Sequence, residues 1–169
     1  TGRPGICYVI TGPGLTNTLT PLGQAYSDSV PVLAISSCLD ETVATRGQLH
    51  QMRDQAGAAR AVCDWSEEAR KAEAAYALID RAFTEFQTQR QRPKHIAVPV
   101  RELEALAEPG DWKGEASAFD KPQASPADAE RVARHLTKAR RPLIVFGGGA
   151  VGAVELARGI TRRGKIASF

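Results

Sequence analysis

Three short apolar runs, each bounded by turn-forming residues, limit the folds open to this chain more than any other feature. They cover residues 6–11 (ICYVIT), 31–36 (PVLAIS) and 95–100 (HIAVPV). A short continuous apolar run is typical of a strand that is covered on both faces, as in a parallel sheet. We therefore predict that these three runs are neighbouring parallel strands of an α/β fold.

Segments with a helical pattern lie between these runs. We expect one helix over about residues 16–27, with Pro21 inside it, and another over about residues 71–87, where apolar residues recur at helical spacing. Residues 37–64 have weak periodicity and are predicted to form a long functional loop with a short helix. This alternation predicts a mostly parallel sheet flanked by helices.

A change in composition predicts a domain boundary. Residues 102–124 lose periodicity and gain proline, glycine and charge, which is typical of a linker between domains 1–101 and 125–169. Ser125 and Pro126 fit the cap and first position of a helix that opens a second, Rossmann-like α/β domain. The elements expected there are a helix over 126–139, a strand over 142–146, a tight turn at 147–149, and a helix over 151–163 with Gly164 just past its end. Because both ends of the chain look abrupt, we expect a piece of a longer protein.

Charge and cysteine content exclude several classes of function. The 22 basic and 19 acidic residues give a net charge of +3 and are interleaved, so no nucleic-acid surface is expected. The three cysteines are widely separated, and their spacing does not fit a structural zinc site. No apolar stretch approaches the roughly 18 residues of a membrane span, and no signal peptide opens the chain, so we expect a cytoplasmic protein without a membrane partner.

Two glycine-rich turns follow predicted strands and are candidate binding sites. Such turns leave helix N–H groups unpaired and let a ligand approach the backbone. The turn at 147–152 (GGGAVG) has no acidic residue in the required place before the chain ends, so we expect close packing of strand on helix there rather than a dinucleotide. In Gly12-Pro13-Gly14 the proline stiffens the turn and removes a donor. That rigid, partly apolar rim fits ligand contact and a structural turn equally well.

His50 is the candidate catalytic residue. It lies in the long loop after a predicted strand, and such loops gather beyond the carboxyl ends of parallel strands, where ligands bind. An imidazole there suits proton transfer or substrate orientation, and a surface histidine without function is the alternative. We expect His95 and His135 to be structural, because one opens a strand and the other lies on a helix.

Several ordered motifs make the chain resemble the thiamine diphosphate-dependent enzymes of the acetolactate synthase type. The motifs are TGRPG (residues 1–5), TGPGLTN (11–17), AYSDSVP (25–31), RAF (81–83), RP (92–93) and HIAVP (95–99). The segment from Leu22 to Tyr26, and Leu49-His50 before Asp54-Gln55, are most similar to bacterial 5-guanidino-2-oxopentanoate decarboxylases. Acetolactate synthases usually carry Phe-Gln-Glu where this chain has Leu49-His50-Gln51, which argues against acetolactate formation.

The resemblance implies a division of labour within a longer enzyme. Residues 1–101 resemble the later part of the pyrimidine-binding domain, and residues 125–169 resemble the start of the central domain, which in some relatives holds FAD. It implies that Gly12, Pro13, Gly14 and Asn17 line the aminopyrimidine ring of thiamine diphosphate, with Leu49, His50 and Gln51 near the substrate. The family's cofactor-activating glutamate has no counterpart in this chain, and the motif that holds Mg²⁺ and diphosphate belongs to a later domain.

The first hypothesis is therefore a fragment of a thiamine diphosphate-dependent 2-oxo acid decarboxylase or carboligase. The resemblance implies that the parent is a homodimer or homotetramer acting on a small 2-oxo acid, and that this chain alone is inactive. A non-catalytic binding or assembly module derived from the family is the alternative. A third hypothesis, a nicotinamide or flavin protein, relies on the glycine-rich turn at 147–152.

Overall fold

The computed structural model describes residues 3–39, 47–106 and 123–169 of the chain. The chain divides into two compact units, Thr1–Lys121 and Pro122–Phe169. Most of the predicted linker, residues 107–122, and part of the predicted long loop, residues 40–46, lie outside the described residues.

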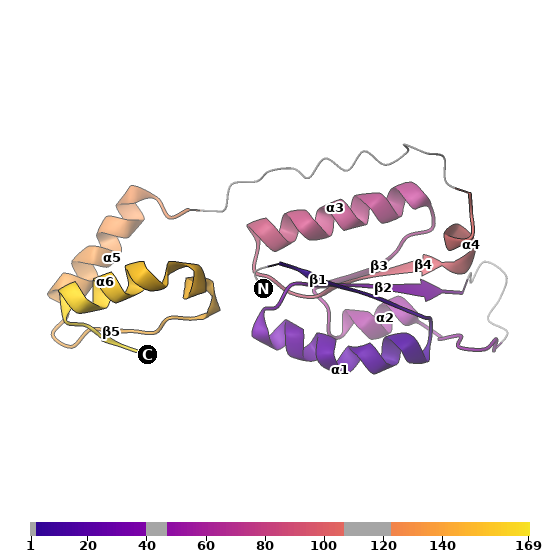
Figure 1. The fold of residues 1–169 in the computed structure, drawn as a ribbon, viewed down its shortest axis with the longest axis horizontal. Coiled ribbons are helices and arrows are strands. Elements are labelled where there is room, and N and C mark those ends of the chain that lie inside the picture. The colour runs from indigo at the N-terminus through magenta and orange to yellow at the C-terminus, as the bar shows by residue number, and fades with distance from the viewer. Residues whose placement is uncertain (1–2, 40–46, 107–122) are drawn as a thin grey trace. The chain divides into compact units, whose positions relative to one another are not determined.

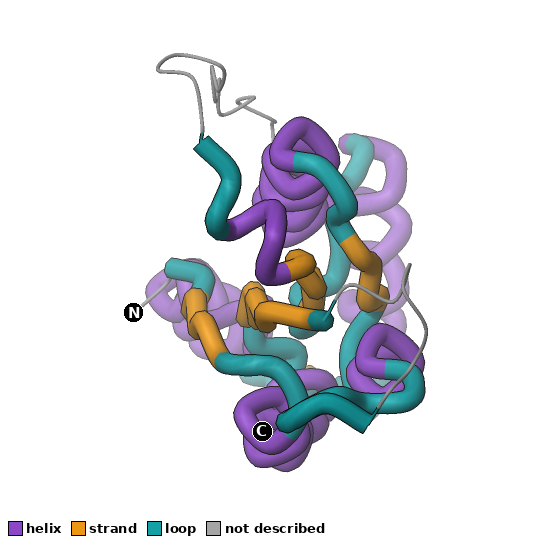
Figure 2. Tube along the Cα trace, turned by 90° about the vertical axis from the view of Figure 1, so that its right-hand side faces the viewer, coloured by secondary structure: helices purple, strands orange, loops and turns teal. Residues whose placement is uncertain are grey.

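The first unit is built on a four-stranded parallel sheet with the order β1-β2-β4-β3. The strands are β1 (Gly5–Val9), β2 (Val32–Cys38), β3 (Trp65–Glu68) and β4 (Lys94–Pro99). Helices α1 (Pro13–Asp28) and α2 (Gln55–Arg60) cover one face and α3 (Ala72–Thr88) covers the other, while the short α4 (Val100–Leu103) follows β4 (Figure 1). Figure 2 shows the strands of this unit with helices on both sides. The predicted α/β fold and its three parallel strands are confirmed.

Strand β3 is an element that the sequence pattern did not predict. Its four residues, WSEE, include two glutamates and follow directly on the segment expected to be a loop. It is an edge strand, so it pairs with β4 alone, and Trp65 and Ser66 are buried while Glu67 is exposed. A strand this short and this polar has no apolar run by which to recognise it.

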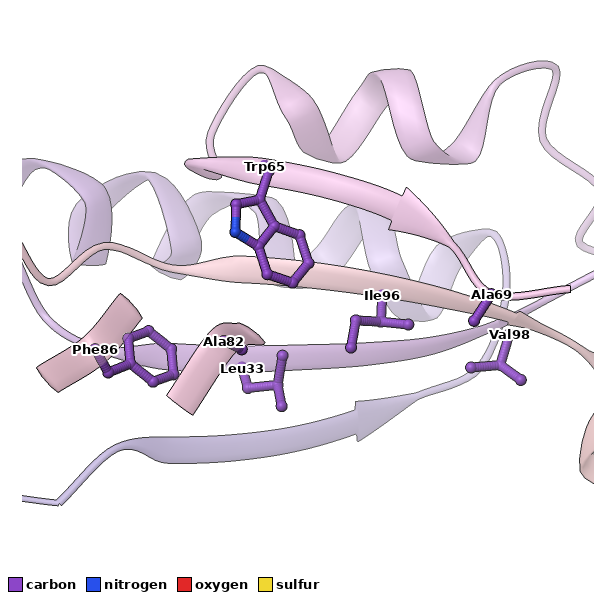
Figure 3. Close-up of a cluster of buried hydrophobic side chains, with 7 residues drawn as sticks. All are labelled: Leu33, Trp65, Ala69, Ala82, Phe86, Ile96 and Val98. Carbon is purple, nitrogen blue, oxygen red and sulfur yellow. The ribbon is translucent and has the colours of Figure 1, made fainter. Parts of the chain in front are cut away.

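Two clusters of apolar side chains hold the helices against the sheet. Under α3 lies a cluster formed by Leu33, Trp65, Ala69, Ala82, Phe86, Ile96 and Val98 (Figure 3). Under α1 and α2 lies a second cluster of Leu15, Leu22, Ala34, Ala59 and Cys63, with Cys7 and Val9 packed against it. Consecutive residues of β2 point to opposite faces of the sheet and enter different clusters, Leu33 the one under α3 and Ala34 the one under α1 and α2. Because both faces are buried, the sequence of this strand is continuously apolar.

Helix α1 begins earlier than the sequence pattern predicted. Pro13 takes the first helical position, where a missing N–H costs nothing, and Gly14 lies within the helix. Only Gly12 of the Gly-Pro-Gly sequence is outside it, as the cap residue with φ 66°. Pro21 lies inside the helix, which continues through it to Asp28. The helix ends at Ser29, whose left-handed backbone (φ 58°) precedes Pro31.

The second unit contains helix α5 (Pro126–Lys138), strand β5 (Leu143–Ile144), the 3-10 helix η2 (Gly148–Ala153), helix α6 (Val154–Gly164) and strand β6 (Ala167–Ser168). The predicted cap of α5 is confirmed, since the side chain of Ser125 accepts a hydrogen bond from the backbone N–H of Asp128. β5 pairs with β6 in a sheet of its own, separate from that of the first unit.

Three predictions for the second unit were wrong in detail. The 3-10 helix η2 (Gly148–Ala153) takes the place of the predicted tight turn and of the start of the predicted helix over 151–163, and α6 begins at Val154. Close packing at the glycine-rich turn does not occur, because a Cβ atom on Gly147, Gly148 or Gly149 would have no neighbour within 4 Å. Gly164 is the last residue of α6, and Lys165 takes the left-handed conformation (φ 49°) in its place. A Cβ atom on Gly164 would lie 2.7 Å from the terminal side-chain carbon of Ile166, which would have to shift to make room for it.

Candidate functional site

The turn after β1 and the segment around His50 meet at the carboxyl edge of the sheet. A Cβ atom on Gly12 would overlap the carbonyl oxygen of His50 and lie 3.0 Å from the Cα of His50. The hydroxyl of Thr11 lies 3.2 Å from that same carbonyl oxygen. The structure thus brings together two predicted site residues, Gly12 and His50, that are 38 positions apart. The backbone of Gly12 is therefore approached closely by the backbone of His50, a residue of the same chain.

His50 has an uncommon backbone conformation. Its φ is 65°, in the left-handed region that non-glycine residues seldom adopt. The preceding turn is closed by the N–H of Gln51, which donates to the carbonyl of Gln48, and by the side chain of Gln51, which accepts from the N–H of Gln48. His50 and Gln51 are half-buried, whereas the side chain of Leu49 is 82% exposed. Such strained backbone is frequent at binding sites, where the surrounding structure holds it in place.

The other predicted site residues lie on the first turn of α1. Pro13 and Asn17 are exposed, and their spacing of four residues places them on the same side of the helix. A Cβ atom on Gly14 would lie 2.7 Å from a side-chain carbon of Ile10, which would have to shift to make room for it. Pro13 brings no N–H to this surface, and the exposed Leu49 is apolar. A rim with these properties fits a heterocyclic ring better than it fits a phosphate group.

A buried chain of polar side chains runs beneath the Gly12 turn. Gln55, the first residue of α2, accepts from the Thr11 hydroxyl (2.7 Å) and the Gly12 N–H (3.3 Å). Its amide nitrogen donates to the Ser36 hydroxyl (2.8 Å) and to the Ser37 carbonyl (2.7 Å). Beyond Ser36, the ring of His95 bridges to the hydroxyl of Ser66 on β3, at 2.8 Å from Ser36 and 2.7 Å from Ser66. All of these side chains are buried.

Sequence reasoning missed this chain of polar residues, except for the expectation that His95 is structural. The available signal was the pair of serines that ends an otherwise apolar strand, since a buried hydroxyl requires a partner. The register places His95 opposite Ala34 on one side and Ser66 on the other, so Ser66 and His95 lie on the same face of the sheet. Burial lowers the pKa of His95 to about 4, which keeps its ring neutral near pH 7.

A small polar cavity lies beside Gln55. Its volume is about 40 Å³, enough for a water molecule, and its lining includes Thr11, Cys38, Gln51, Asp54, Gln55 and Glu68. Asp54 is also the cap of α2, since its carboxylate accepts a hydrogen bond from the N–H of Gly57 at 2.7 Å. Among the described residues, no group of three or more histidine, cysteine or acidic side chains is placed to hold a metal ion.

The cysteines are not arranged as reactive thiols. Burial raises the pKa of Cys7, and burial, followed by the charges of Cys7 and Asp64, raises the pKa of Cys63 to about 12. Cys38 is also buried. None of the helices in the described ranges is long and apolar enough to cross a membrane.

Comparisons with known proteins agree on one family. Residues 1–58 match the family described as thiamine pyrophosphate enzyme, N-terminal TPP binding domain. Over 167 residues, the chain is 39% identical to a Pseudomonas aeruginosa protein named probable 2-ketoarginine decarboxylase AruI, covering 96% of this chain and 29% of that protein. The chain belongs to the thiamine pyrophosphate enzyme family. The predicted resemblance is therefore confirmed.

Other relatives in the family are more distant. The identity is 30% to glyoxylate carboligase from Escherichia coli O157:H7, covering 90% of this chain and 26% of that one. It is 24% to the large subunit of acetolactate synthase isozyme 1 from Escherichia coli K12, covering 98% and 29%. The crystal structure of a candidate thiamin diphosphate-dependent enzyme from Mycobacterium smegmatis has the same fold, with a TM-score of 0.83 at 18% identity, covering 99% of this chain and 32% of that one. The chain thus spans about a third or less of the length of these relatives.

Proposed function

We propose that this chain is part of a thiamine diphosphate-dependent decarboxylase that acts on 5-guanidino-2-oxopentanoate, also called 2-ketoarginine. The main support is the 39% identity to the protein named as a 2-ketoarginine decarboxylase, against 24% to an acetolactate synthase subunit. The segment Leu49-His50-Gln51, which departs from the acetolactate synthase pattern, packs against the Gly12 turn and so lies where it can influence the choice of substrate. In the reaction the bond between C1 and C2 breaks, CO₂ leaves, and a proton is added at C2.

Gly12, Pro13, Gly14 and Asn17 are proposed to hold the pyrimidine side of the cofactor. The rim formed by Pro13 and its neighbours is rigid and has few donors, and the exposed Asn17 side chain adds one polar group at its border. When bound, thiamine diphosphate supplies the electron sink that the breaking C1–C2 bond requires. The role proposed for the protein is to orient the cofactor ring and the substrate.

His50 is proposed to handle the proton that the reaction needs at C2. Its backbone is fixed against Gly12, which places His50 beside the turn at which the proposed ring binds. Histidine is suited to proton transfer near neutral pH. Leu49 and Gln51 flank it and are proposed to contact the aliphatic and polar parts of the substrate.

The remaining parts of the proposal concern the whole enzyme. We place the activating glutamate and the sites for Mg²⁺ and diphosphate outside residues 1–169, and FAD in the central domain as an optional group. We propose domains 1–101 and 125–169 joined by the linker 102–124. The enzyme is proposed to be a cytoplasmic homodimer or homotetramer whose active sites lie between subunits.

The decisive experiment is a measurement of CO₂ release by the complete enzyme that carries this chain. With thiamine diphosphate and Mg²⁺ present, we expect turnover of 5-guanidino-2-oxopentanoate and little formation of acetolactate from pyruvate. Turnover should be lost when thiamine diphosphate is removed and should return when it is added back. Equal or better use of pyruvate, with acetolactate as the product, would show that the substrate proposal is wrong.

A further inference from the structure

The side chain of Gln55 connects every segment of the candidate site within the first unit. Its amide oxygen takes hydrogen bonds from the Gly12 N–H and the Thr11 hydroxyl, and Thr11 in turn lies beside the carbonyl oxygen of His50. Its amide nitrogen reaches β2 through Ser36 and Ser37. One buried side chain therefore joins the turn after β1, the end of β2 and the His50 segment.

The orientation of this amide is dictated by backbone groups that have only one possible role. The Gly12 N–H can only donate and the Ser37 carbonyl can only accept, so the oxygen of Gln55 faces Gly12 and its nitrogen faces Ser37. The second N–H of Gln55 goes to the Ser36 hydroxyl, which also forms a hydrogen bond with Nε2 of His95. Nδ1 of His95 forms a hydrogen bond with the hydroxyl of Ser66. A neutral His95 ring is sufficient for this series of hydrogen bonds from Gln55 to Ser66.

The turn that Gln55 holds has little tolerance for displacement. Gly12 has φ 66° and His50 has φ 65°, and the two backbones are in contact. A left-handed backbone at a non-glycine residue persists only where neighbouring contacts maintain it. The N–H of Gly12 donates to Gln55, its carbonyl accepts from the N–H of Thr16 at 3.0 Å, and the Thr11 hydroxyl lies 3.2 Å from the carbonyl oxygen of His50. Of the contacts to Gly12, the one to Gln55 comes from a side chain on another element, and its loss frees the Gly12 N–H.

We propose that Gln55 is a positioning residue of this site, whose amide holds the Gly12 turn and, through the backbone contact of Gly12 with His50, the His50 segment in the geometry that receives the cofactor. The inference rests on the proposed function for its consequence, which is cofactor affinity. Its structural half, that Gln55 immobilises the turn, does not depend on any ligand.

The test compares Gln55→Leu, which keeps the volume and removes the hydrogen bonds, with Ile96→Val. Ile96 is buried next to His95 on β4, but its side chain belongs to the cluster under α3 on the opposite face of the sheet. In the complete enzyme without cofactor, Gln55→Leu should speed amide hydrogen exchange at Gly12 by about tenfold or more, and Ile96→Val should leave it unchanged. The Kd for thiamine diphosphate, measured by calorimetry, should rise about tenfold in Gln55→Leu alone.

Gln55→Glu provides a second variant that keeps the shape of the side chain. An ionised glutamate cannot donate to Ser36 or Ser37, whereas a protonated one can. The protection factor of the Gly12 N–H, which is the intrinsic exchange rate at each pH divided by the observed rate, should therefore rise as pH falls from about 8 to about 5.5. Asp54 and Glu68 line the same cavity and favour protonation of the new carboxyl group, and His95 stays neutral over this range.

The outcomes separate the two proposals. Unchanged exchange at Gly12 in Gln55→Leu overturns the inference whatever the cofactor data show, as does faster exchange with an unchanged Kd. If Gln55→Leu does not fold, a Gly12 protection factor in Gln55→Glu that does not change with pH overturns it. If the wild-type enzyme binds no thiamine diphosphate, the proposed function fails, while hydrogen exchange still decides whether Gln55 holds the turn.

Discussion

At the scale of single residues, His50 carries the clearest functional prediction. In the complete enzyme, His50→Ala should lower kcat about tenfold or more, because a general acid or base contributes about 10²–10⁴-fold. The Kd for thiamine diphosphate should change little. Asn17→Ala is the matched variant, since its residue is proposed to touch the cofactor and should weaken cofactor binding instead. Steady-state kinetics would measure kcat, and calorimetry would measure the Kd for thiamine diphosphate. An unchanged kcat of His50→Ala between about pH 6 and 9 would show that His50 is a surface histidine without a catalytic role.

The buried His95 leads to a separate prediction, which concerns how the free energy of unfolding depends on pH. Its pKa is lowered by burial from 6.5 to about 4 in the folded chain, so the unfolded chain binds a proton more readily than the folded one. The free energy of unfolding should therefore fall as pH drops from about 6.5 to about 4, by roughly 3 kcal/mol from this residue, and should be independent of His95 above about pH 7. Urea denaturation of the wild type and of His95→Gln should show this difference in slope. Parallel curves for the two proteins would contradict it.

At the scale of secondary-structure elements, a buried ion cluster joins α3 to β4 and β3. Lys94 is 1% exposed and contacts Glu85 at 2.8 Å and Asp64 at 2.9 Å, while Glu85 also accepts from the ring N–H of Trp65 and from Arg81. Burial by itself would raise the pKa of Glu85, but the hydrogen bonds from Lys94, Trp65 and Arg81 outweigh it and lower the pKa to about 2. Glu85 therefore stays charged opposite Lys94 at any pH above about 4.5.

Removal of one charged partner from this cluster should lower the free energy of unfolding. Among the described residues, Glu85→Ala leaves the buried Lys94 with Asp64 as its one ion-pair partner, and Asp64 is itself a third exposed. We expect a loss of about 3–5 kcal/mol in the free energy of unfolding. The double variant Glu85→Leu with Lys94→Met removes both charges and should lose much less, because well-packed apolar side chains replace buried ion pairs at little cost. Chemical denaturation of the two variants tests this. Equal losses in both would mean that packing, and not the unpaired charge, explains the effect.

The elements also show which parts of the fold were predictable. The three strands with continuous apolar runs and helix α3 could be predicted because local pattern and burial agree there. The Ser125 cap could be predicted because its hydrogen bond is local. Strand β3 could not, since its order depends on pairing with β4 and not on its own composition. At the candidate site, Gly12 and His50 were predicted separately, but their contact arises from the path of the chain between them. Gln55 has no local signal at all, because its role follows from what the fold places around it.

At the scale of the whole molecule, the first unit leaves one region of its sheet uncovered. β1 is an edge strand whose alternate residues face opposite sides: Cys7 and Val9 pack against the cluster under α1, whereas Ile6 and Tyr8 point to the other side and are 62% and 61% exposed. Ile10, which follows the strand, is 53% exposed. Contiguous apolar surface beside an unpaired strand edge favours association.

We therefore expect the 169-residue chain to self-associate through this region. Replacing Tyr8 with lysine places a charge in the middle of the exposed row and should shift the distribution toward monomer in sedimentation velocity experiments, because burying an unpaired ammonium group in an interface is unfavourable. Thr20→Lys, which adds the same charge at an exposed position of α1, should leave the distribution unchanged. A wild-type chain that sediments as a monomer at all concentrations would mean that the exposed face of β1 does not drive association. A shift produced equally by both variants would mean that net charge, and not this face, controls association.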